Sequence, residues 1–212
     1  MDPFIRSADL HFVLRQARNV MNGHLSVRDE GVLDAVEGLA EERSKERLGD
    51  IPEEALAVIK KIGDVRDQDR FARFREELRP FVIPFPAVTE HQLKKMFPKV
   101  KKLKVPALQD IEWRDLTYLG WNDPGSNRKY IVYEKDGKLT GMHGEFRPSA
   151  KKGACAICKG LDEIGMFMAE TRHSGGVNYT KRGNYICVDS EKCNDRLDDP
   201  DRLGQFIDTL KK

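Results

Sequence analysis

The chain has 212 residues, of which 39% are apolar and 34% charged, the composition of a soluble globular protein with one large or two modest domains. No stretch approaches the ~18 apolar residues of a membrane helix, and charges interrupt every apolar run near the N-terminus, so we expect neither a membrane span nor a secretory signal, and a cytoplasmic location. The formal net charge of +2 divides unevenly, because residues 1–80 carry 14 basic and 17 acidic side chains (−3), which leaves 23 basic and 18 acidic for residues 81–212 (+5).

The first 80 residues predict four short amphipathic helices in an up-down bundle, since apolar residues recur at helical spacing and strand alternation is almost absent. Pro3 is suited to open the first helix and Gly23 to end it, while Ser26 is suited to cap the second. The third begins after Pro52. The apolar stripes are Phe4, Leu10, Val13, Leu14, Ala17 and Met21; Val32, Leu33, Val36, Leu39 and Ala40; Leu56, Ile59 and Ile62; and Phe71, Phe74 and Leu78.

A proline-rich segment at residues 80–86 separates this helical part from the rest of the chain. Each proline lacks an amide donor and favours extended backbone in the preceding residue, so a helix cannot continue through the segment. We therefore expect the domain boundary here, with a helical bundle at residues 1–82 and a second domain at residues 83–212.

The second half predicts one short helix and several strands. Thr89 can cap a helix that runs through Met96. Asp136 and Gly137 are typical of a hairpin turn, because glycine accepts positive φ. Strands are expected at Lys99–Val105, Leu116–Trp121, Tyr130–Tyr133 and Lys138–Phe146. The second domain is therefore expected to be α+β, and the fold class of the whole chain is α+β with a helical N-terminal bundle.

The four cysteines form two pairs within 39 residues. Cys155 and Cys158 have the spacing of a zinc knuckle, and Cys187 and Cys193 lie where an apolar strand runs into a predicted helix. A redox CxxC motif and inert buried thiols are the alternatives, but the βαβ pattern of a thioredoxin-like fold is missing. The spacing favours one structural Zn²⁺ with four sulfur ligands, in a treble-clef-like zinc finger at residues 155–193.

Two surface features accompany the cysteines. Arg182 and Tyr185 alternate with residues expected to face inward, so they are candidates for an interface, whereas Met166 and Met168 are expected in the core. Six lysines gather in residues 94–104, either as a solvated, lysine-protected strand edge or as a surface for RNA or an acidic protein. These lysines are Lys94, Lys95, Lys99, Lys101, Lys102 and Lys104.

Catalytic motifs are missing from the sequence. The five histidines are scattered, and no HExxH, GxSxG or phosphate-loop pattern occurs. A zinc ion with four protein ligands offers no open position for a substrate. We therefore expect a binding protein rather than an enzyme.

Several segments resemble the FusB-type proteins, the elongation factor G-binding family that includes determinants of fusidic acid resistance and has also carried a fibronectin-binding label. The resemblance covers essentially the whole chain. It rests on the lysine-rich segment Pro98–Pro106, on Gly120-Trp121-Asn122 with Ser126–Tyr130, on Gly144-Glu145, and on the two cysteine pairs with Tyr185–Cys193 as the most specific block.

The resemblance implies a cytoplasmic protein whose zinc domain binds elongation factor G (EF-G) and promotes its release from ribosomes on which fusidic acid has trapped it. It implies partner contacts at Ala154, Arg182, Tyr185 and Phe206. Ala154 stands where the resistance proteins carry a bulky aromatic residue, which predicts weaker binding. Phe206 precedes Ile207 and Leu210, so a core position is its alternative. The alternative function is a zinc-stabilised RNA- or ribosome-binding module that uses the lysines of residues 94–104.

Overall fold

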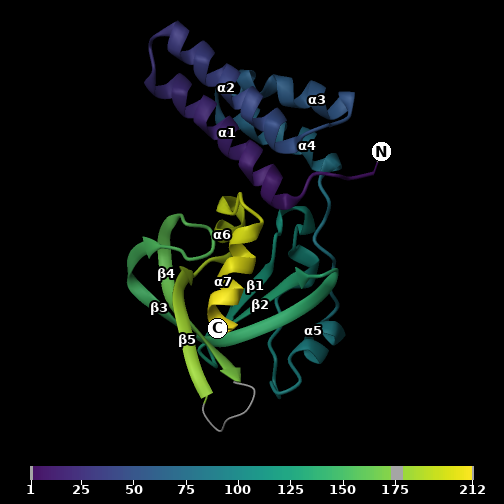
Figure 1. Ribbon diagram of the computed structural model, residues 1–212, viewed down its shortest axis with the longest axis vertical. Coiled ribbons are helices and arrows are strands. Elements are labelled where there is room, and N and C mark those ends of the chain that lie inside the picture. Colours follow the sequence, from purple (N-terminus) through teal and green to yellow (C-terminus); the bar gives the residue numbers. More distant parts are fainter. Residues whose placement is uncertain (1, 173–178, 212) are drawn as a thin grey trace. The chain divides into compact units, whose positions relative to one another are not determined.

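The computed structural model describes residues 2–172 and 179–211 and divides the chain into two compact units, Met1–Ile83 and Pro84–Lys212. The first unit contains the four expected helices, and the second contains a five-stranded antiparallel sheet with further helices (Figure 1). The α+β fold class is confirmed. Among the described residues, every helix is too short or too polar to cross a bilayer.

The first unit is built from α1 (Ser7–Ser26), α2 (Glu30–Leu48), α3 (Glu53–Ile59) and α4 (Gln68–Leu78), with the 3-10 turns η1 (Lys60–Asp64) and η2 (Arg79–Phe81). The two long helices lie side by side (Figure 1). The core is built mainly from the apolar stripes of α1, η1 and α4, and Val13, Leu14, Ile62 and Leu78 are all at most 1% exposed. Ala40 of α2 and Ile59 of α3 complete it. A bridge between Ile5 and Val82 joins the two ends of the unit.

Two expectations for the first unit are wrong in detail. Gly23 does not end α1; it is buried inside the helix, which continues to Ser26, and a Cβ there would make only an ordinary van der Waals contact with Leu33 at 3.6 Å. Ser26 caps nothing and instead donates to the carbonyl of Asn22, while the carboxylate of Asp29 accepts from Val32 N–H and begins α2. The stripe on α2 is only partly covered, because Val32 is 48% exposed.

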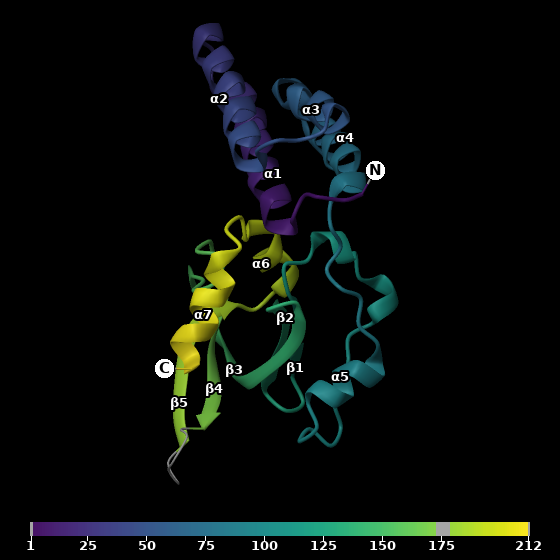
Figure 2. The same cartoon turned by 45° about the vertical axis from the view of Figure 1, so that its right-hand side comes forward.

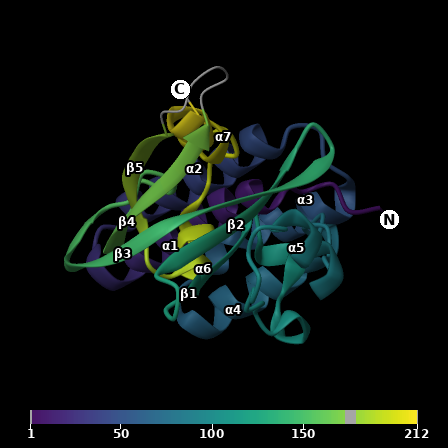
Figure 3. The same ribbon diagram turned by 90° about the horizontal axis from the view of Figure 1, so that it is seen from below.

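The sheet of the second unit follows chain order, β1-β2-β3-β4-β5. Its strands are β1 (Leu119–Asp123), β2 (Arg128–Lys135), β3 (Lys138–Ala154), β4 (Leu161–Arg172) and β5 (Tyr179–Cys187). The expected turn is present, since Asp136 and Gly137 take φ values of 51° and 71° between the paired Lys135 and Lys138. The long β3 pairs first with β2 and then, from Gly144 onward, with β4 (Figure 3).

Strand β2 is buried on both faces, so it separates two apolar cores. Ile131 and Tyr133 point into the core that holds α6 (Ser190–Arg196) and α7 (Asp201–Lys211). Tyr130 and Val132 point to the opposite side, where α5 (Glu90–Met96) packs (Figure 2). This alternation is the period of two that a strand imposes on its side chains.

The expected strand at Lys99–Val105 is wrong. After α5, which the capping box of Thr89 and Gln92 begins, the chain forms turns at residues 98–102 and no strand. The physical reason lies in the flanking Pro98 and Pro106, which cannot donate to a sheet, and in Leu103, which turns inward to the core beside α5. The six lysines of this segment are all exposed.

Candidate metal centre

The four cysteines come from three places in the fold. Cys155 and Cys158 lie on the turn between β3 and β4, Cys187 ends β5, and Cys193 lies in α6. The turn closes because Lys159 takes a left-handed φ of 62° and donates its N–H to the carbonyl of Cys155 at 2.9 Å. A knuckle, a hairpin and a helix that supplies the last ligand make up a treble clef.

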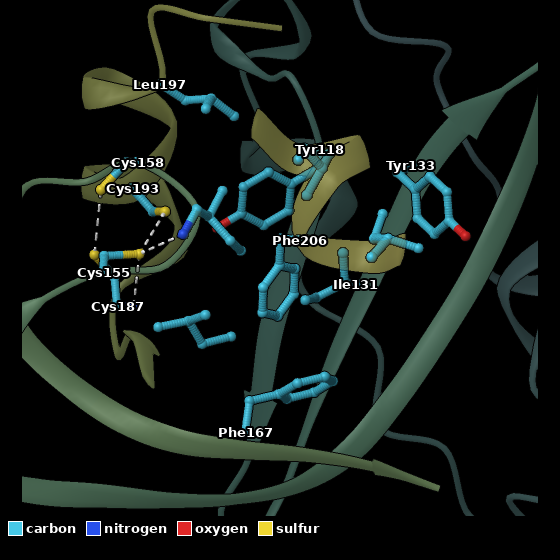
Figure 4. Packing of buried hydrophobic residues seen from close by; sticks show 14 of the residues in the cluster. Tyr118, Ile131, Tyr133, Cys155, Cys158, Phe167, Cys187, Cys193, Leu197 and Phe206 are labelled. Atoms are coloured by element: carbon cyan, nitrogen blue, oxygen red, sulfur yellow. Dashed lines mark hydrogen bonds between the residues drawn. The ribbon is translucent and has the colours of Figure 1, made fainter. Parts of the chain in front are cut away.

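The sulfur atoms have the spacing that zinc requires. All four Sγ atoms lie within 4.8 Å of one another, with 3.8 Å between Cys155 and Cys193 and 3.7 Å between Cys158 and Cys187. A tetrahedron with Zn–S bonds of about 2.3 Å has S–S edges of about 3.8 Å. The thiols are at most 3% exposed and lie at the border of the core that contains Tyr118 (Figure 4). The donor set therefore fits a structural zinc with all four positions filled by protein.

Backbone and side-chain donors favour the thiolate form of Cys155. The N–H groups of Ile157 and Cys187 each donate to the sulfur of Cys155 at 3.4 Å. Hydrogen bonds from the other thiols, that of Cys158 foremost, lower the pKa of Cys155. Burial, followed by the negative charge of Cys193, raises the pKa of Tyr118 well above its usual value, so this hydroxyl stays neutral beside the sulfurs.

Lys129 is the residue beside the metal centre that the sequence analysis missed. It is fully buried, and its ammonium donates to Asn122 Oδ1 at 3.0 Å and to the carbonyl of Val188 at 2.9 Å, directly after Cys187. Burial lowers the pKa of Lys129 to about 8, while the charges of the nearby thiolates oppose this shift. The ammonium thus offsets the negative charge of the sulfur cluster and ties β2 to the ligand loop. The hint in the sequence is a lysine directly before the apolar run Tyr130–Tyr133.

Asn194 fixes the helix that carries Cys193. Its Oδ1 accepts from Thr117 N–H at 2.8 Å and from Tyr118 N–H at 3.2 Å, and its Nδ2 donates to the carbonyls of Tyr118 and Ser190. The close approach requires glycine at position 120, because a Cβ there would lie 2.5 Å from Ser190 Oγ. The motif residues of the family resemblance therefore include parts that dock α6 on β1.

We expect Lys129→Met to destabilise the second unit by about 1–3 kcal/mol, because methionine fills the space but leaves Asn122 Oδ1 without its donor and the buried cluster without its counter-charge. Denaturant unfolding of the zinc-loaded protein measures the loss. Lys135→Met is the matched control, since Lys135 is exposed at the far end of the same strand. Equal stability of the two variants would contradict the role given to Lys129.

The expected partner-contact residues do not share one environment. Ala154 is exposed at the end of β3, and Tyr185 is 43% exposed and Arg182 half-buried on β5. The carbonyl of Tyr185 accepts from Ala156 N–H at 2.8 Å, which joins β5 to the zinc knuckle. Phe206, in contrast, is 3% exposed and lies in the core with its ring 6.1 Å from that of Phe167 (Figure 4).

One exposed apolar residue at this surface was not expected. Leu161 begins β4 directly opposite Ala154 and is 76% exposed. No sequence signal distinguishes it from a core leucine, because its exposure depends on the pairing of β3 with β4. We define the knuckle surface as Ala154, Leu161 and Tyr185. Arg182 pairs with Ala169 and lies three positions from Tyr185 on β5, so its side chain is on the other face of the strand.

Each of the two units matches a known protein-family model. Residues 4–86 match the model of the N-terminal domain of elongation factor G-binding proteins, and residues 96–205 match the FBP C-terminal treble-clef zinc-finger model. A solved structure described as "Structure of the fusidic acid resistance protein FusC" is similar, with a TM-score of 0.80 and 35% sequence identity over 98% of this chain and 97% of that chain. The comparison with curated protein sequences gave no match.

The second unit is therefore a treble-clef zinc-finger domain with one structural zinc, which the four clustered cysteines would hold. Together with the first unit it defines a two-part zinc-finger protein of the kind that binds a translation factor. The chain belongs to the FusB-type family of elongation factor G-binding proteins, as the sequence resemblance indicated.

Proposed function

We propose that this protein acts in the cytoplasm as a non-enzymatic partner of EF-G. It binds EF-G through the knuckle surface and promotes release of EF-G from the ribosome, which protects translation from fusidic acid. The family assignment supports EF-G as the partner. The observation that carries the choice of surface is the pair of exposed side chains, Leu161 and Tyr185, held beside a closed metal site.

The zinc supports this function by holding the surface in shape. Four protein sulfurs leave no coordination position for a substrate, so the metal fixes the knuckle and the end of β5 in one geometry. A surface that is ordered before binding loses less conformational entropy on association than a flexible loop. Tyrosine is one of the residue types that carry interface energy, and the exposed Leu161 adds apolar area near it.

We expect Tyr185→Ala and Leu161→Ala each to weaken EF-G binding by about 1–3 kcal/mol, with zinc content and melting temperature near those of the parent. Calorimetric titration against purified EF-G measures the affinity. Leu25→Ala is the matched control, because Leu25 is 78% exposed and lies in the other unit. If all three variants bind equally, the knuckle surface is not the contact.

The release step needs its own measurement. Ribosomes stalled with EF-G, GDP and fusidic acid should lose EF-G faster when the parent protein is added than when Tyr185→Ala is added. If the parent protein binds EF-G but does not speed its loss from the stalled ribosomes, the EF-G-binding proposal stands and the release proposal fails.

A further inference from the structure

A groove of about 430 Å³ lies between η1 and α4 in the first unit. Four cations line it: Lys61 from η1, Arg66 from the connecting turn, and Arg70 and Arg73 from α4. The rim also carries the acidic Asp64 and Glu77, so the groove has a formal charge of +2 (four cations less two carboxylates).

This concentration of cations contrasts with its surroundings. The helical unit as a whole is negative, with 14 basic and 17 acidic side chains in residues 1–80. A second groove beside η1 shares Asp64 with the first and is lined by Asp34, Glu37 and Glu41, with Lys60 as its one cation. Of these two grooves, the one between η1 and α4 carries the excess of cations, so it is the one that attracts a polyanion.

Two of the four cationic side chains make no ion pair or hydrogen bond with the described part of the chain. Arg66 and Arg73 are exposed, and neither side chain forms an ion pair or hydrogen bond within residues 2–172 and 179–211. Lys61 pairs with Glu77 at 2.5 Å, and Arg70 reaches Asp67 at 3.6 Å. Cations that share one groove repel one another, and a bound anion would remove this repulsion.

The floor of the groove argues against a protein partner. Val65 and Phe74 lie beneath the cations, but they are only 2% and 3% exposed, so no apolar anchor is offered. Protein interfaces depend on such anchors, whereas a nucleic-acid backbone is bound mainly through charge. The guanidinium group presents a planar fork of donors that matches phosphate oxygens.

We infer that the groove between η1 and α4 binds phosphate groups of an RNA backbone. This is a second binding activity, located in the helical unit and independent of the EF-G contact proposed for the knuckle surface. Contacts to the backbone carry no base information, so the binding is insensitive to sequence and strongly salt-dependent.

The test compares two charge-matched variants of the full chain. Arg66→Gln/Arg73→Gln removes the two free cations of the groove. Arg28→Gln/Arg43→Gln removes two exposed, unengaged arginines elsewhere in the same unit. Fluorescence anisotropy with a labelled RNA hairpin of about 16 base pairs, between roughly 50 and 200 mM KCl, reports the affinity and its salt dependence.

We expect the groove variant to bind this RNA about tenfold more weakly and to lower the slope of log K against log [KCl] by about 1.5, since two phosphate contacts are lost. The control variant should change affinity less than about threefold. Both should keep the parent's melting temperature and EF-G affinity. Under these results the groove site stands, whatever the knuckle variants show.

Three results would overturn the inference. Equal losses in both variants would indicate a response to net charge alone. An unchanged groove variant, with RNA binding removed by Lys99→Gln/Lys101→Gln/Lys102→Gln, would place RNA on the second unit. Displacement of the RNA by polyglutamate at lower concentration than by unlabelled RNA would identify an acidic protein as the ligand.

Discussion

Cys187→Ser is expected to release the zinc and unfold at least the β4–β5 hairpin. Serine leaves three sulfurs, and it replaces the side chain at the point where β5 meets Ile164 of β4. Metal binding contributes an apparent ~10–16 kcal/mol to the folding of small zinc modules, more than a typical domain has in reserve. The zinc content measured by metal analysis should fall from one ion per chain to none. The hydrogen exchange of backbone amides in β4 and β5 should become faster.

The helical unit provides the internal control for this variant. Its core is separate and contains no cysteine, so amide exchange in α1 and α4 should stay at the level of the parent. Treatment of the parent with a strong chelator should reproduce the effect. A well-folded second unit without metal would contradict the structural role of the zinc.

Phe206→Ala is expected to cost about 3–5 kcal/mol of stability, the usual loss when a buried phenylalanine is truncated. Phe206 lies on α7 among the side chains that join this helix to the sheet, and it is 3% exposed. Denaturant unfolding measures the loss. The expected loss of stability comes from the cavity that the truncation leaves beneath α7, and not from a lost contact with a partner.

The neighbouring Gln205→Ala separates the two roles that the sequence allowed for Phe206. Gln205 is exposed on the same helix, so its truncation should leave stability within about 0.5 kcal/mol of the parent. If Phe206→Ala is as stable as this control and yet binds EF-G more weakly, then Phe206 is a contact residue and the core assignment fails.

The features that could be predicted from the sequence have local causes. Helical spacing, the cap at Thr89 and the turn at Asp136-Gly137 involve residues within one element, and the structure confirms them. The zinc site could also be predicted, because the knuckle spacing of Cys155 and Cys158 is itself local and the remaining two cysteines complete a set of four.

The features that were missed depend on which elements meet. The mixture of lysines and apolar residues at 99–105 suggested a strand, but the sheet of the described residues contains no strand there. Lys129 can be buried because its ammonium finds acceptors on other elements, Asn122 Oδ1 on β1 and the carbonyl of Val188, 59 positions away. On an isolated helix the side chain of Phe206 could face either solvent or the core. The packing of α7 on the sheet places it in the core. Propensity and spacing carry no information on such long-range partners.

The distribution of the zinc ligands along the chain has a consequence for how the protein is made. Cys193 follows Cys155 by 38 positions, so a ribosome working at about 5–20 residues per second needs roughly 2 to 8 seconds between the first and the last ligand. During this interval the nascent chain offers only an incomplete site, for which other cellular thiols compete. Until Cys193 has been added, at most three of the four sulfurs can hold the metal, so the zinc site closes only after the whole segment 155–193 has been made.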